Sequence, residues 1–279
     1  MNIGIRLHDT APGTLEERLA ASKRQGFCCA HLALSKVLPD FSMKDAPCLL
    51  DDALAERVRH AFAAEHMDCA VLGCYLTLAP RDEQDRESTQ TIYASHLRFC
   101  RQIGARLVGT ETPAEKSIPW TEACRSEELL AHFIDCLRPI VRRAEEENTV
   151  IAIEPVYRHI VSTPERAQRV LEAIPSEHLR IILDAVNLLS QPTAEQADSI
   201  VADAIARLGD RVSVLHFKDY MEVPGQVELK SIACGTGSMR YERLLAFGKA
   251  RDLPITLENT TPENAEAARL YLENIAKTL

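Results

Sequence analysis

Short apolar segments alternate with longer amphipathic stretches along the whole chain. Eight of these segments are rich in β-branched and other apolar side chains and are too short to be helices. Such runs are typical of strands that are buried on both faces of a parallel sheet. We therefore predict strands at residues 3–7, 28–33, 69–73, 106–109, 150–154, 180–183, 212–217 and 255–258.

Helical periodicity fills most of the gaps between the apolar segments. In residues 14–25, Thr14 precedes Glu17 by three positions, which is the spacing of a capping box at the start of a helix. Further helices are predicted at 83–102, 124–147, 165–174 and 195–208, and a last one ends near residue 277. Each amphipathic stretch is long enough to cover one strand from the outside.

The strict alternation of strand and helix predicts one parallel sheet with its helices outside. Eight units within 279 residues favour a closed (β/α)8 barrel, the TIM barrel, over an open sheet. An open dinucleotide-binding sheet would carry Gly-x-Gly-x-x-Gly after its first strand, and Leu7-His8-Asp9 stands there instead. No linker divides the chain, so residues 1–279 are predicted to form one domain. Residues 35–48, with two prolines, are the longest predicted loop and a candidate lid.

Composition and charge restrict the class of protein. The formal net charge is −9, from 41 acidic and 32 basic residues, and no cluster of Lys and Arg forms a basic patch. We therefore expect no nucleic-acid partner. No apolar run is long enough for a membrane span, and the first residues lack the zones of a signal peptide. Nine cysteines without any Cys-x-x-Cys spacing predict reduced, mostly buried thiols, so we expect a cytoplasmic enzyme.

One ionisable side chain follows the apolar run of each of the last four predicted strands. These runs end in Ile-Ala-Ile-Glu154, Ile-Ile-Leu-Asp184, Ser-Val-Leu-His216 and Ile-Thr-Leu-Glu258. The C-terminal strand ends of such a barrel meet at one face, where the four groups should converge. A divalent cation removes the repulsion among three buried carboxylates. We therefore predict that these four residues bind one divalent metal ion: manganese, magnesium, cobalt or zinc.

Other polar residues follow the predicted strands and are candidates for the substrate pocket. The candidate substrate contacts are His8, Glu111, His159, Asn187 and Lys218, and Tyr75 ends the third strand. For His159 and Asn187 the alternative is an ordinary polar loop residue, and for Lys218 it is a surface salt bridge with Asp219. The Gly235-Thr-Gly237 segment is either a tight turn or a place where backbone amides approach a hydroxyl or phosphate.

Five short motifs carry a resemblance to a known family: Ile-Glu154-Pro, Leu-Asp184-x-x-Asn187, His216-x-Lys218-Asp219, Gly235-x-Gly237 and Leu-Glu258-Asn. In this order and spacing, the sequence resembles the xylose isomerase-like barrel superfamily of sugar isomerases and epimerases. In ketose 3-epimerases of that superfamily, the equivalent residues hold the metal and the two glutamates exchange protons with the substrate. The resemblance therefore implies that Glu154 and Glu258 are catalytic, with a proton moved through an ene-diolate on a sugar or sugar-like substrate.

Two positions depart from the family pattern. Many members end the second strand in a glutamate, where this chain has His31, and some epimerases have a histidine where this chain has Asn187. The resemblance implies an isomerase or epimerase and leaves an inosose-type dehydratase as the alternative. Abasic-site endonucleases of the superfamily need several zinc ions and a charge suited to DNA, and a non-catalytic sugar-binding barrel is a further alternative. Family habit implies a homodimer or homotetramer.

Overall fold

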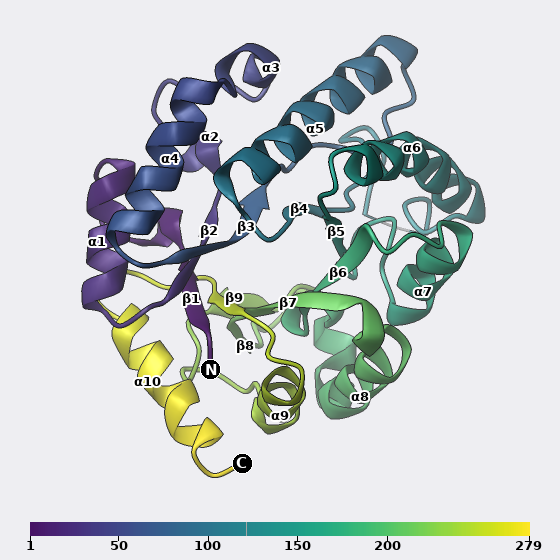
Figure 1. The fold of residues 1–279 in the computed structure, drawn as a ribbon. Helices are drawn as coiled ribbons and strands as arrows, with labels where there is room; N and C mark the ends of the chain where they lie inside the picture. The colour runs from purple at the N-terminus through teal and green to yellow at the C-terminus, as the bar shows by residue number, and fades with distance from the viewer. Residues whose placement is uncertain (121) are drawn as a thin grey trace.

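Eight parallel strands pair edge to edge and close into a barrel in the computed structural model, which describes residues 1–120 and 122–279 (Figure 1). The strand order is β1-β10-β7-β6-β5-β4-β3-β2. The strands are β1 (Ile3–Arg6), β2 (Cys29–Leu32), β3 (Asp68–Gly73), β4 (Val108–Glu111), β5 (Ile151–Glu154), β6 (Leu179–Asp184), β7 (Val212–Phe217) and β10 (Ile255–Leu257). The predicted TIM barrel is confirmed, and each of the eight predicted segments contains one of these strands or overlaps it.

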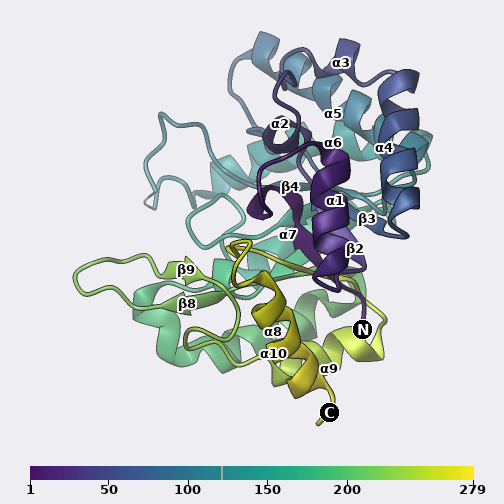
Figure 2. The same cartoon turned by 90° about the vertical axis from the view of Figure 1, so that its left-hand side faces the viewer.

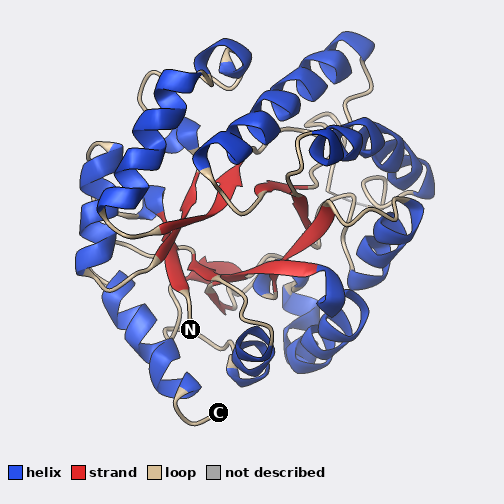
Figure 3. Ribbon diagram, in the orientation of Figure 1, coloured by secondary structure: helices blue, strands red, loops and turns tan. Residues whose placement is uncertain are grey.

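Helices surround the barrel and separate its strands from solvent (Figure 3). The longer ones are α1 (Leu15–Arg24), α4 (Asp52–Ala64), α5 (Glu83–Ile103), α6 (Glu127–Glu146), α7 (Pro164–Ala173), α8 (Ala197–Leu208), α9 (Glu242–Ala250) and α10 (Ala265–Ala276). The capping box predicted at the start of α1 is present, because Glu17 N donates to Thr14 Oγ1 and Thr14 N donates to Glu17 Oε2. Local capping chemistry therefore fixes where this helix begins.

Parts of the prediction are wrong. Residues 35–48 are not a continuous loop, because they overlap α2 (Leu34–Val37) and include most of α3 (Ala46–Leu49). Two short strands, β8 (Asp219–Met221) and β9 (Lys230–Ile232), form an antiparallel hairpin that extends away from the barrel (Figure 2). Strands of three residues outside the barrel are too short to show a hydrophobic repeat, so periodicity did not predict them.

Small and branched side chains fill the interior of the barrel. A buried cluster there consists of Cys29, Ala70, Val71, Leu107, Ala152, Ile182 and Val214. Gly109 on β4 is required by this packing, since a Cβ there would lie 2.6 Å from Val71 Cγ1 and 2.7 Å from Ile182 Cδ1. Such dense apolar packing leaves the C-terminal strand ends as the place for buried polar chemistry. Within the described residues, no helix is long and apolar enough to cross a membrane.

Candidate metal centre

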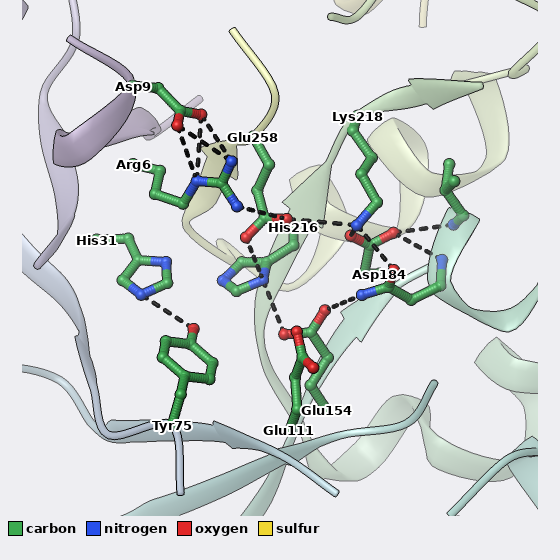
Figure 4. A network of polar contacts seen from close by, with 12 residues as sticks. Arg6, Asp9, His31, Tyr75, Glu111, Glu154, Asp184, His216, Lys218 and Glu258 are labelled. Carbon is green, nitrogen blue, oxygen red and sulfur yellow. Dashed lines mark hydrogen bonds and ion pairs between the residues drawn. The ribbon is translucent and has the colours of Figure 1, made fainter. Parts of the chain in front are cut away.

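Four strands that are neighbours in the barrel bring the predicted metal-binding residues to one place (Figure 4). Glu154 ends β5 and Asp184 ends β6, while His216 lies near the end of β7 and Glu258 directly follows β10. Asp184 and His216 are register partners across the β6–β7 pair. All four residues are buried, with exposures of only 1% to 6%.

The ring of His216 lies between the two glutamates. Its Nδ1 is 3.1 Å from Glu154 Oε2 and 3.3 Å from Glu258 Oε1. The ligand atoms of Glu154, Asp184 and His216 all lie within 4.8 Å of one another, and His31, His216 and Glu258 form a second such group. Within the described residues, both ring nitrogens of His216 are buried without a well-formed hydrogen bond. An imidazole whose nitrogens lack hydrogen-bond partners, next to carboxylates, fits a divalent cation.

Lys218 is a buried counter-ion inside this cluster. Its Nζ lies 2.8 Å from Asp184 Oδ2 and 3.4 Å from Glu258 Oε2, and it donates to Asn187 Oδ1. The surface salt bridge between Lys218 and Asp219 that the sequence left open is wrong, because the lysine points into the barrel mouth (Figure 4). The positive charge of Lys218 therefore partly balances the negative charges of Asp184 and Glu258.

Asn187 connects the candidate ligands to Lys218. Its side-chain Nδ2 donates to Glu154 Oε1 at 2.6 Å, and its Oδ1 accepts from Lys218 Nζ at 2.8 Å. Its backbone N–H also donates to Asp184 Oδ1 at 3.1 Å. Because both ends of the amide are engaged, Asn187 holds the orientation of Glu154, while its contact with substrate stays a prediction.

Burial and the neighbouring charges shift the pKa values of the cluster in different directions. Burial alone would lower the pKa of His216, but the charges of Glu154 and Glu258 outweigh burial and raise it to about 9. Burial raises the pKa of Asp184 to about 6, although Lys218 opposes the rise. For Glu258, burial is outweighed by Lys218 and His216, which hold its pKa well below the usual range. A divalent cation would supply the positive charge that these groups otherwise take from protons and lysine.

Asp219, the first residue of β8, anchors the Gly235-Thr-Gly237 turn. Its Oδ1 accepts from the backbone N–H of Tyr220 and of Met239, each at 2.8 Å. Its Oδ2 accepts from Gly235 N at 3.0 Å and from Gly237 N at 2.9 Å. A Cβ at Gly237 would lie 2.2 Å from Tyr220 O, so only glycine fits. The segment is therefore a tight turn. The amides of Gly235 and Gly237, which would have to donate to a phosphate, already donate to Asp219.

We expect Asp219→Ala to lower the free energy of unfolding by about 3 kcal/mol, because it leaves four backbone donors without their acceptor. Asp219→Asn should lose less, since an amide oxygen can still accept from Tyr220 and Met239. Urea unfolding followed by circular dichroism measures both changes. The control is Asp203→Asn, which breaks only an exposed ion pair with Arg207. Unfolding of Asp219→Ala at the wild-type urea concentration would contradict the anchoring role.

A pocket of about 400 Å³ opens beside the candidate metal ligands. Its lining residues are Arg6, His8, His31, Ala33, Ser35, Lys36, Met43, Tyr75, Glu111 and Glu258. Of the predicted substrate contacts, His8 and Glu111 therefore face this pocket. His159 is buried, with its Nδ1 3.7 Å from Glu111 Oε2. Burial, followed by the nearby charges of Glu154 and Glu258, raises the pKa of Glu111 to about 7.

Arg6 and His31 belong to the site although sequence reasoning gave them no role. Arg6 Nη1 lies 3.4 Å from Glu258 Oε2. His31 Nε2 hydrogen-bonds Tyr75 OH at 3.0 Å, and its ring stacks on His216 with centroids 5.3 Å apart. The rule used for the last four strands, that strand ends form the site, also identifies Arg6 at the end of β1.

A known protein family and many solved structures are similar to this chain. A family model described as a xylose isomerase-like TIM barrel matches residues 20–276. A comparison with curated proteins finds no match. Many solved structures share the fold, and three of them differ in their chemistry.

The first is a D-psicose 3-epimerase with D-tagatose from Clostridium cellulolyticum H10, with a TM-score of 0.75 at 14% identity over 99% of each chain. The IolI protein with a bound zinc atom has a TM-score of 0.69 at 19% identity, covering 100% of this chain and 96% of its own. The probable 3-DHS dehydratase AsbF from Bacillus anthracis has a TM-score of 0.74 at 12% identity, covering 100% and 98%. At these identities, the likeness shows the shared barrel.

Proposed function

Because the chain belongs to the xylose isomerase-like TIM barrel family, we propose that it is a divalent-metal-dependent isomerase or epimerase of a sugar or sugar-like substrate. The fold alone does not give this activity, so the site must support it. The observation that carries the proposal is that both Glu154 and Glu258 lie within 3.3 Å of one nitrogen of His216, next to the pocket. Two carboxylates at one candidate metal site are suited to proton transfer on a bound substrate.

The residues that would hold the ion are Glu154, Asp184, His216 and Glu258. Three carboxylates and one imidazole suit manganese, magnesium, cobalt or zinc. When bound, the ion supplies Lewis-acid chemistry that stabilises negative charge on the carbonyl and hydroxyl oxygens of the substrate. The IolI structure, which contains zinc, supports this assignment for the family, although the ion used by this chain is part of the proposal.

The chain's own residues divide the proton transfer between them. Glu154 would remove the proton from the carbon next to the carbonyl, or return one to it, and Glu258 would do the opposite. Asn187 fixes Glu154 through its 2.6 Å hydrogen bond, while Lys218 and Arg6 hold Glu258 from its other oxygen. Delivery to the same carbon gives an epimer, whereas delivery to the neighbouring carbon gives an aldose–ketose isomer.

A dehydratase is the second candidate, and Glu111 is the observation that favours it. Glu111 lines the pocket, and burial, followed by the charges of Glu154 and Glu258, raises its pKa to about 7. A protonated carboxyl beside the substrate can give that proton to a departing hydroxyl. The first step, removal of a proton next to a carbonyl, would be shared with the isomerase.

Incubation of a panel of ketoses and inososes in deuterated water with added manganese tests the proposed function. We expect deuterium at the carbon next to the carbonyl of at least one ketose, with an epimer or isomer as the product detected by NMR. Loss of water from an inosose would instead identify the dehydratase. Metal and sugar binding without any exchange of substrate protons would contradict both and support a binding protein.

A further inference from the structure

Four basic side chains and one serine line part of the pocket. We call this the basic wall, and it consists of Arg6, His8, His31, Ser35 and Lys36. Arg6 and His31 are register partners on the adjacent strands β1 and β2, so their side chains stand next to each other (Figure 4). His8 lies just after β1, and Ser35 and Lys36 lie in α2, just after β2.

Lys36 is a cation of this wall for which the described residues provide no ion-pair partner. Arg6 is balanced by Asp9, which accepts from its guanidinium at 3.1 Å, and it also lies near Glu258. Within the part of the chain that the structure describes, Lys36 makes no ion pair, and its side chain is exposed at the pocket. Glu111 and Glu258 line the same pocket, but neither of them forms an ion pair with Lys36 among the described residues, so its ammonium group is free to bind an anionic group.

Two imidazole rings add uncharged hydrogen-bonding groups beside this lysine. His31 is only 1% exposed, and its Nδ1 is buried without a partner among the described residues. The Nδ1 of His8 is likewise buried without a hydrogen-bond partner among the described residues. Gly73 leaves the space that holds the His31 ring, since a Cβ there would lie 2.8 Å from His31 Nε2 and 2.7 Å from Tyr75 Cε2. A buried nitrogen that is fixed in place and unpartnered indicates that a ligand atom completes it.

We propose that the substrate carries an anionic substituent, a carboxylate or a phosphate, which binds at the basic wall with Lys36 as its ion-pair partner and with Ser35, His8 and His31 as hydrogen-bonding groups. This inference rests on the proposed function, because it places the sugar-like part of the same substrate against the metal centre. The pocket of about 400 Å³ is within the size range of small-molecule sites, roughly 300–1,000 Å³.

Calorimetric binding of matched neutral and anionic ligands to the manganese-loaded protein tests this proposal. The pairs are D-fructose with D-fructose 6-phosphate, D-glucose with D-glucuronate, and myo-inositol with quinate. We expect the anionic member of at least one pair to bind about tenfold more tightly than its neutral partner. The first pair reports on phosphate and the other two on carboxylate, so the pair that responds identifies the anionic group.

Lys36→Gln should remove most of this preference and leave the affinity for the neutral members unchanged. The matched control is Lys249→Gln, an exposed lysine on α9, which should keep the preference. Equal affinity within all three pairs, absence of binding included, would overturn the proposal. A preference that survives in Lys36→Gln would also overturn it, because the ion pair with Lys36 would then not be the source of the preference. These measurements need no turnover, so a failure here is distinguishable from a failure of deuterium exchange.

Discussion

Replacement of Glu154 or Glu258 by glutamine is expected to reduce turnover about 10²- to 10⁴-fold while removing much less of the bound metal. Glutamine keeps the size of the side chain and one acceptor oxygen, but it cannot act as a base. At position 154, the amide oxygen can still accept from Asn187 Nδ2, so the local geometry should persist. Turnover is measured with the substrate found by deuterium exchange, and the metal content of each variant by elemental analysis.

The two glutamine variants should also differ in the label that they incorporate. In an epimerase, the two faces of the carbon are served by different residues, so one variant can still exchange deuterium into a substrate of one configuration without converting it. A dehydratase variant should lose exchange and elimination together. Glu228→Gln is the control, because it changes a half-exposed glutamate that pairs with Arg158 outside the metal centre. Wild-type turnover by both variants would rule out the two-glutamate mechanism.

Asp184→Asn and His216→Ala are expected to weaken metal binding at least about tenfold. In Asp184→Asn, one oxygen can still accept from the backbone N–H of Val186 and Asn187, so the loop after β6 should keep its shape. The other oxygen is replaced by an uncharged amide nitrogen next to Lys218 Nζ. This nitrogen can neither bind a cation nor balance the charge of the lysine. His216→Ala removes the imidazole between the two glutamates.

Titration with manganese, followed by calorimetry, measures this affinity in each variant. Asp203→Asn is the matched control, since its carboxylate pairs with Arg207 on the exposed surface of α8. Thermal unfolding provides a second readout, because added metal should raise the unfolding temperature of the wild type more than that of either variant. A variant that binds manganese as tightly as the wild type would show that the metal site is placed wrongly.

Local sequence patterns determined the strands and the candidate metal ligands. The apolar runs before Glu154, Asp184, His216 and Glu258 predicted buried strands that end in ionisable groups. Parallel strands in a closed barrel share one C-terminal face, so the convergence of the four side chains followed from topology. The capping box at Thr14 was predictable for a similar reason, because its two hydrogen bonds join residues only three positions apart.

The tertiary structure alone decided where the neighbouring polar side chains point. Lys218 and Asp219 are adjacent in sequence, yet one enters the metal centre and the other anchors a turn, since successive side chains of an extended backbone alternate in direction. The contacts of Arg6 and His31 with the site depend on β1 closing against β10 and β2. Charge balance inside the pocket is a sum over many chain segments, and no local pattern in the sequence contains that sum.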